Sequence, residues 1–287
     1  MPKDKAKQGE SVADRAEESE RIDTARAVAA AAERIGTAMT LHVDGIELAA
    51  YYVVPGELAR QRPALVLCNG YPSGAKAPFA AKNGQIEPDL ADRIALDCGC
   101  AVVTFDYRGV GKSTGNFSLS GWLNDIRAAI NFAFDELKCS GIVLAGFRTG
   151  GALCICVAAE EPRVHGVIAM GPQADFKDWA TDPRKFLALN RDLGMIRSPD
   201  FPPDLNSWSH DLKDIRPIEA VKKMGTRPFM VIHGSMDVTT PPIHSEALAE
   251  AAGDTADLRI LLGAGHFLRY DPRAIAMLLG WIGRIVN

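Results

Sequence analysis

The chain has 287 residues, of which 47% are hydrophobic and 24% are charged, and its formal net charge is −4. This is ordinary globular composition, and a chain of this length can bury a substantial core without disulfides or metal ions. The acidic balance gives no basic face for nucleic acid, and no apolar run approaches the ~18 residues that cross a membrane. The start of the chain lacks the apolar stretch of a secretory signal, and the six cysteines lack zinc-site spacing. We therefore expect a cytoplasmic protein with reduced, structural cysteines that binds neither nucleic acid nor membrane.

Residues 1–37 are charged and alanine-rich, and from about Ser11 their composition favours a helix. The sequence predicts a helical or partly disordered N-terminal extension here. A docked helix and an oligomerisation arm both fit this composition, so a homo-oligomer stays open.

From residue 38 onward, strand-like and helix-like segments alternate. Residues 38–43 and 47–55 predict a strand pair that turns at Asp44-Gly45. An unbroken apolar run at 63–70 is typical of a strand buried on both faces, and 100–107 and 141–147 are predicted to be further buried strands. Strands are also predicted at 164–171, 229–234 and 258–263. Helices are predicted at about 88–98, 119–137, 149–161, 242–252 and 272–285.

This alternation predicts an α/β domain over residues 38–287, with a mainly parallel sheet flanked by helices and right-handed crossovers. One stretch, about 173–226, interrupts the alternation of strands and helices after the sixth strand, and it contains aromatic residues among prolines and charged residues. We expect this stretch to form a small cap insertion. Its tryptophans and phenylalanines predict a pocket roof that favours a partly apolar small-molecule ligand.

The most specific motif is GFRTGG (146–151), which lies between a buried strand and a buried helix. This is the context of the nucleophile elbow, G-x-S-x-G, in which a sharp turn lifts one side chain to the top of the sheet. The central position holds Arg148 in place of serine. The flanking glycines predict a positive φ at Arg148 and backbone packing too close for side chains.

Four further motifs stand in a fixed order around this one. Asp237 follows the strand 229–234, and His266 follows the strand 258–263. The segment 106–113 reads D-x-R-G-x-G-x-S, and Asn69-Gly70-Tyr71 follows the third strand.

Together these motifs resemble the α/β-hydrolase superfamily, in particular its esterase and prolyl-oligopeptidase-like branches, over about residues 38–287. The resemblance implies an α/β-hydrolase fold without cofactor or metal, in which Asp237 is the acid and His266 the base. It also implies that the backbone N–H groups of Tyr71 and Thr149 form the oxyanion hole. Arg148 then occupies the position of the nucleophile.

Because of Arg148, the activity expected of this chain differs from the activity of the family. A guanidinium stays protonated and cannot attack a carbonyl, whereas acyl-enzyme chemistry needs an activated hydroxyl or thiol beside the base. Asp237 and His266 are still expected within hydrogen-bond reach of each other. Asp175 is an alternative acid position, and His233 is expected to be a packed histidine at a strand end.

An enzyme with an unusual mechanism remains open, in which His266 is the base and activates water or a remote nucleophile, Thr149 or Cys68. Three further functions remain open from the sequence. The first is a hydrolase-family protein related to enzymes that cleave esters, thioesters or amides, impaired by Arg148; this is the one we favour. The second is a non-catalytic pseudo-hydrolase that binds a ligand or partner, with Arg148 anchoring an anionic group. The third is a serine hydrolase carrying a Ser-to-Arg change at position 148.

Overall fold

The computed structural model describes residues 34–72 and 86–286. The chain forms two units, Met1–Ile35 and Gly36–Asn287. Nearly all of the expected N-terminal extension lies outside the described residues. The fold below is that of the second unit.

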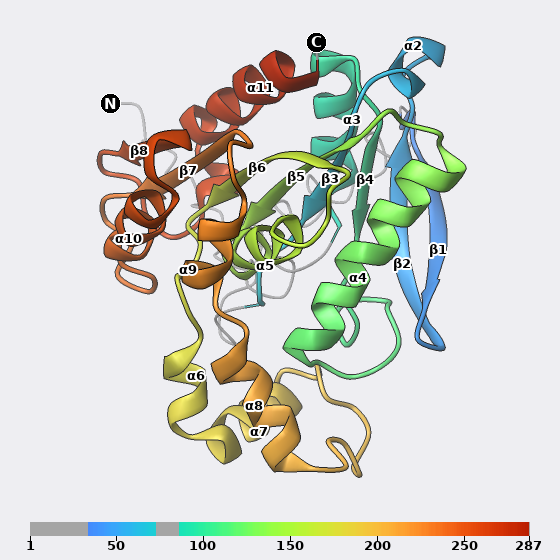
Figure 1. Ribbon diagram of the computed structural model, residues 1–287. Coiled ribbons are helices and arrows are strands. Elements are labelled where there is room, and N and C mark those ends of the chain that lie inside the picture. The colour runs from blue at the N-terminus through green and yellow to red at the C-terminus, as the bar shows by residue number, and fades with distance from the viewer. Residues whose placement is uncertain (1–33, 73–85, 287) are drawn as a thin grey trace, which may run out of the picture. The chain divides into compact units, whose positions relative to one another are not determined.

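One eight-stranded sheet organises this unit, with the order β1-β2-β4-β3-β5-β6-β7-β8 (Figure 1). The strands are β1 (Thr37–Val43), β2 (Ile46–Val53), β3 (Ala64–Cys68), β4 (Val102–Phe105), β5 (Ile142–Phe147), β6 (Val164–Met170), β7 (Phe229–Gly234) and β8 (Ala256–Leu261). β2 runs antiparallel to both of its neighbours, and the pairs from β4 through β8 are parallel. The predicted strand pair turns at Asp44 and Gly45, which have φ 53 and 73. The expected α/β architecture with a mainly parallel sheet is confirmed.

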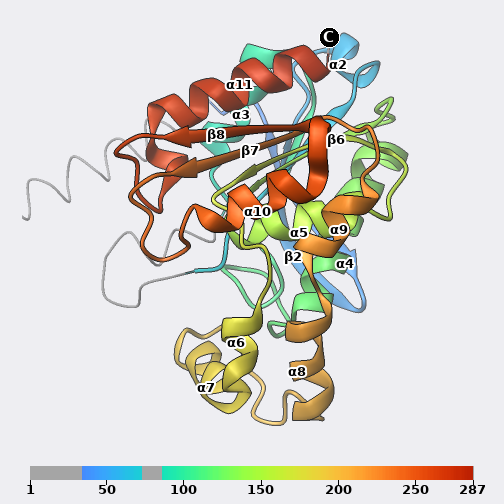
Figure 2. The same ribbon diagram turned by 60° about the vertical axis from the view of Figure 1, so that its left-hand side comes forward.

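Helices cover both faces of the sheet, as Figures 1 and 2 show. α3 (Pro88–Cys98) and α11 (Pro272–Val286) pack on one face, and α4 (Leu119–Asn131), α5 (Thr149–Ala158) and α10 (Ile243–Ala252) pack on the other. None of the helices in the described ranges is both long enough and apolar enough to cross a membrane.

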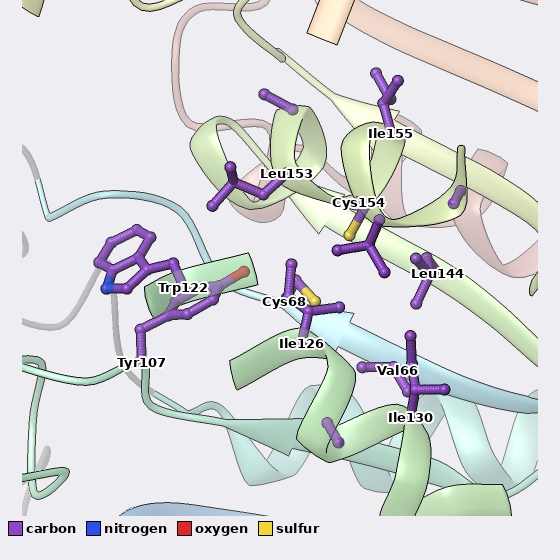
Figure 3. Packing of buried hydrophobic residues seen from close by; sticks show 14 of the residues in the cluster. Val66, Cys68, Tyr107, Trp122, Ile126, Ile130, Leu144, Leu153, Cys154 and Ile155 are labelled. Carbon is purple, nitrogen blue, oxygen red and sulfur yellow. The ribbon is translucent and has the colours of Figure 1, made fainter. Parts of the chain in front are cut away.

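The larger core lies between the centre of the sheet and the helices α4 and α5 (Figure 3). Val66 of β3 and Leu144 of β5 face Ile126 and Ile130 of α4, and all four are fully buried. Fully burying one such side chain stabilises the fold by about 1.5–3 kcal/mol. Every residue of β3, β4 and β5 is buried, as the unbroken apolar runs predict for strands covered on both faces. The six cysteines, all within the described residues, are buried and form no disulfide.

The insertion after β6 contains α6 (Lys177–Thr181), α7 (Pro183–Asp192), α8 (Leu205–Asp214) and α9 (Pro217–Ala220). α6, α7 and α8 gather away from α3 and α11 (Figures 1 and 2). Their aromatic rings pack on one another: Trp179 stacks on Phe186 with centroids 4.7 Å apart, and Phe186 stacks on Trp208 at 5.9 Å. The aromatic residues of the insertion therefore form its internal packing, and Tyr71 joins them from the loop that follows β3, stacked on Phe186 at 5.9 Å.

Several elements differ from the sequence pattern; β4, for example, spans Val102–Phe105 within the expected strand 100–107. The helix expected over 119–137 is α4 followed by one π-helical turn, η1 (Phe132–Glu136). The last strand ends at Leu261 rather than at residue 263, because Leu262 is exposed and Gly263 turns the chain with φ 74.

Candidate active site

The turn between β5 and α5 places Arg148 at the carboxyl end of the sheet's central strand. Arg148 is the N-cap residue of α5 with φ 51 and ψ −121, a conformation that costs a non-glycine residue about 1–3 kcal/mol. Its N–H donates to the carbonyl of Met170 at 2.7 Å, and its own carbonyl accepts from the N–H of Ala152 at 3.0 Å. These bonds to β6 and to the first turn of α5 hold the positive φ that the sequence predicts.

The glycines around this turn are required by close backbone contact. A Cβ at Gly150 would lie 2.2 Å from the carbonyl oxygen of Asn69, and one at Gly146 would lie 2.4 Å from the nitrogen of Gly151. Distances below 3.0 Å to backbone atoms leave no room for a side chain. The turn is therefore packed backbone to backbone against the loop that follows β3.

The acid and the base predicted from the sequence meet in the structure. Nδ1 of His266 lies 2.9 Å from Oδ2 and 3.1 Å from Oδ1 of Asp237. Asp237 is 4% exposed, and its carboxylate also accepts hydrogen bonds from the N–H groups of Thr239 and Thr240, each at 2.9 Å. The loop after β7 thus fixes this carboxylate and aims it at the His266 ring.

The electrostatics keep this carboxylate ionised. Burial raises the pKa of Asp237, but hydrogen bonds from His233 and His266 outweigh burial and hold that pKa well below its usual range. His233 itself is fully buried at the end of β7, where its ring meets Ser245 Oγ at 2.6 Å and the Thr240 carbonyl at 2.7 Å. This agrees with its expected place as a packed strand-end histidine.

Arg148 reaches the other nitrogen of the same imidazole. Its Nη1 lies 3.3 Å from Nε2 of His266. A guanidinium can only donate a hydrogen bond, so Nε2 accepts here and the proton on the ring sits at Nδ1, facing Asp237. The nitrogen that a general base would offer to a nucleophile is therefore occupied by a cation.

The guanidinium is buried, with 5% of Arg148 exposed, and its carbon lies 5.4 Å from the centroid of the Phe267 ring. Burial and the nearby Arg269 cation lower the pKa of Arg148 to about 10, against the attraction of Asp237. Arg148 consequently remains a cation at neutral pH.

The loop after β3 lies against this turn and is held by a second buried arginine. Nη2 of Arg269 donates to Oδ1 of Asn69 at 2.8 Å, and its Nε lies 3.2 Å from Oε1 of Glu87. A Cβ at Gly70, the next residue, would lie 2.8 Å from Nε of Arg148. Thr149 begins α5, so its N–H has no acceptor within the helix. The loop and the helix start are thus neighbours, as the expected oxyanion role of Tyr71 and Thr149 requires.

A pocket of about 190 Å³ opens over these residues. Of the five site residues predicted from the sequence, four line it: Tyr71, Arg148, Thr149 and His266. The fifth, Asp237, lies behind His266. Asp175 also lines the pocket, but its carboxylate is bound to Lys177, 3.1 Å from Nζ, while Asp237 holds the ring of His266.

The pocket includes residues that sequence reasoning did not select, among them Gln173, Asp178 and His244. Gln173 follows the end of β6 closely, and side chains at the carboxyl ends of parallel strands commonly line a site, so its position carried a usable signal. His244 lines the pocket from the start of α10, and its position in the sequence does not indicate this.

A family model described as the alpha/beta hydrolase fold matches residues 63–212. The curated relatives include an uncharacterized protein, YfhR, from two Escherichia coli strains, each 28% identical over 174 residues. That match covers 60% of this chain and 55% of the relative, so the chain spans about half the length of the curated relatives it matches.

Solved structures show the same fold. Est1E from Butyrivibrio proteoclasticus with ferulic acid bound superposes with a TM-score of 0.64 at 23% identity, over 86% of this chain and 96% of Est1E. The α/β hydrolase GrgF from a Penicillium species gives 0.64 at 19% identity, over 88% and 99% of the two chains. An esterase from Pyrococcus furiosus gives 0.62 at 15% identity, over 88% and 91%. With the family model matching more than half of its residues, this chain belongs to the α/β-hydrolase fold family.

Proposed function

We propose that this protein is a hydrolase-family member impaired in ester hydrolysis, whose pocket binds a small ligand through an anionic group. The contact between Nη1 of Arg148 and Nε2 of His266 carries this proposal. In a serine hydrolase the base receives a proton from the nucleophile through that nitrogen. Here the nitrogen faces a side chain that has no proton acceptor and no nucleophilic atom.

Among the residues that the structure describes, no other side chain takes the place of the nucleophile. Thr149 Oγ1 accepts a hydrogen bond from Gln173 at 3.3 Å, and Cys68 is fully buried in the core. Among the described residues, His266 forms hydrogen bonds with Asp237 and Arg148 and with no hydroxyl or thiol. Nucleophilic catalysis needs such a group within hydrogen-bond reach of the base.

The test is the hydrolysis of a short-chain nitrophenyl ester by the unaltered protein and by Arg148→Ser. We expect the unaltered protein to stay near the uncatalysed rate. The substitution should raise kcat/KM by about 10²–10⁴-fold, the usual contribution of a positioned base, because Asp237 and His266 are already aligned.

The control is the double variant Arg148→Ser with His266→Ala, which should return to background. Robust turnover by the unaltered protein that is abolished by His266→Ala and untouched by Arg148→Ala would overturn the proposal. It would point instead to hydrolysis by water with His266 as the base.

The aligned pair of Asp237 and His266 also favours a second candidate, a serine hydrolase that carries a Ser-to-Arg change. The two candidates differ in ligand binding. If Arg148 anchors a ligand, a carboxylate should bind the unaltered protein and lose affinity in Arg148→Met, since a guanidinium pairs with carboxylates in a geometry that no neutral side chain offers. If the change only disables an enzyme, the carboxylate should bind neither protein.

A further inference from the structure

We propose that β8, the last strand of the sheet, pairs antiparallel with β8 of a second copy of this chain, around a two-fold axis at Leu258. Within the described residues β8 hydrogen-bonds to β7 on one side and has no strand on the other (Figure 1). An unpaired strand edge presents a row of N–H and C=O groups that can pair with another strand. The proposal does not depend on the function proposed above.

The backbone of β8 directs the groups of every second residue away from β7. The N–H of Ser235, which follows β7, donates to the carbonyl of Leu261 at 3.0 Å, so the backbone groups of Leu261 face β7. These groups alternate between the two edges of a strand, so those of Leu258, three positions earlier, face outward. With the axis at this residue, the two copies of Leu258 exchange both of their backbone hydrogen bonds.

The charged side chains of β8 are self-complementary around this axis. Asp257 and Arg259 lie on one face of the strand, with Nε of Arg259 2.6 Å from Oδ1 of Asp257, and 54% of the arginine and 36% of the aspartate side chain exposed. Antiparallel pairing centred on Leu258 places Asp257 of each copy directly opposite Arg259 of the other. Opposite charges at such positions stabilise a strand pair, and the axis repeats the contact.

The same charges exclude the neighbouring registers. Moving the axis by one residue places either Asp257 or Arg259 opposite its own copy, and like charges directly opposite are destabilising. Moving it by two residues leaves each charge opposite an uncharged residue. Charges on an edge strand usually prevent pairing, but here they permit the one register centred on Leu258. The other edge strand, β1, contains no Asp, Glu, Lys or Arg and has no such selection.

The experiment is sedimentation equilibrium of the full chain over a range of concentrations, and we expect the unaltered chain to form a dimer. Asp257→Arg and Arg259→Asp each replace two attractive cross-strand pairs with two repulsive ones. Each substitution should therefore raise the dissociation constant of the dimer about tenfold or more.

An equimolar mixture of the two variants separates contacts between copies from contacts within one chain. Both variants have lost the pair of Asp257 with Arg259 inside the chain, but in a mixed dimer two arginines of one copy face two aspartates of the other. With one variant carrying a fluorescent label, we expect a mixed dimer that forms about as tightly as the unaltered one.

Two controls accompany these measurements. Asp192→Arg and Arg184→Asp make the same changes of charge at exposed positions of α7 and should leave the dissociation constant unchanged. Circular dichroism checks that each variant is folded. In the unaltered chain, the amide hydrogen of Leu258 should exchange more slowly at concentrations above the dissociation constant than below it, because it is then hydrogen-bonded.

Three results would contradict the proposal. If the unaltered chain stays monomeric throughout the range, the edge of β8 does not pair with a second copy. If Asp257→Arg and Arg259→Asp leave a dimer intact, the two copies meet at another surface. If both substitutions weaken the dimer and the mixture does not restore it, the two charges act only within their own chain.

Discussion

The imidazole of His266 lies between a carboxylate that only accepts and a guanidinium that only donates. Asp237 is 2.9 Å from Nδ1, and Arg148 is 3.3 Å from Nε2. With these two neighbours the ring adopts one tautomer, which has its hydrogen on Nδ1 and a lone pair on Nε2. The ring is thus oriented as in a working triad, but its basic nitrogen points at a cation.

This arrangement can be observed directly. In the ¹⁵N-labelled protein near neutral pH, we expect two-bond ¹H–¹⁵N spectra to show His266 with a protonated Nδ1 and an unprotonated Nε2. His210 is exposed and lies outside the pocket, so its ring serves as the internal control. A proton found on Nε2 of His266 would contradict the contact with Arg148.

At this scale the sequence predicts part of the site. The glycines around position 148 indicate the positive φ, and the order of Asp237 and His266 after two strands indicates that they meet. The contact of Arg148 with His266 depends on the rotamer of a long side chain, which no spacing in the sequence determines. The hydrogen bond from Arg269 to Asn69 joins positions 200 residues apart, and no sequence pattern predicts it either.

At the scale of elements, the turn between β5 and α5 is locked against the loop that follows β3. The contact is between backbones, since the space beside Gly150 is filled by the carbonyl of Asn69. Backbone atoms inside a packed sheet cannot move aside cheaply.

Gly150→Ala should therefore destabilise the protein by about 1–3 kcal/mol, as overpacking in a core commonly does. Gly280→Ala is the matched control, because Gly280 is an exposed glycine inside α11 where an added Cβ would have nothing within 4 Å. That substitution should stabilise the protein by up to about 1 kcal/mol through helix propensity. The measurement is the free energy of unfolding in urea. Equal effects of the two substitutions would show that the turn has room to relax.

Most elements follow from local pattern, and the exceptions have physical causes. Unbroken apolar runs identify β3, β4 and β5, because both faces of these strands are covered by helices. Gly263 sets the end of β8, because its positive φ turns the chain. The apolar residues before it do not indicate this turn. The π-helical turn after α4 retains helical periodicity in its sequence, so the pattern predicts an ordinary helix there.

At the scale of the whole described unit, the insertion is tied to the sheet by polar contacts as well as by aromatic packing. Arg197 lies between α7 and α8 and donates to three carbonyls of the turn that follows β4. Its Nη1 reaches Ser113 at 2.9 Å, and its Nη2 reaches Gly109 and Gly111 at 3.2 Å each. One side chain thus joins the roof of the pocket to the body of the domain.

Removing this side chain should loosen the insertion without unfolding the sheet. We expect Arg197→Ala to increase the rate of limited proteolysis within the insertion about tenfold, since each lost hydrogen bond contributes about 1 kcal/mol or less at a partly exposed site. Arg184→Ala removes an exposed arginine of α7 and is the control. Unchanged cleavage in Arg197→Ala would mean that aromatic packing alone holds the insertion in place.

The sequence also predicts the general plan at this scale, including the insertion after the sixth strand. It does not predict which insertion residues reach the pocket. Asp178 and Trp179 line it because α6 follows β6 after a short connection. Tyr71 meets them because its ring packs on Trp179 and Phe186. These contacts follow from three-dimensional packing between distant segments, which single-sequence periodicity does not encode.

The side chain at position 148 has a consequence for chemical profiling of this fold family. Phosphonylating reagents label serine hydrolases by forming a bond to the activated serine oxygen at the elbow. Here the elbow presents nitrogen atoms of a guanidinium, which remains charged because its pKa is about 10. Such a reagent finds no activated hydroxyl at position 148, and a survey by covalent labelling would pass over a protein that has the family's fold.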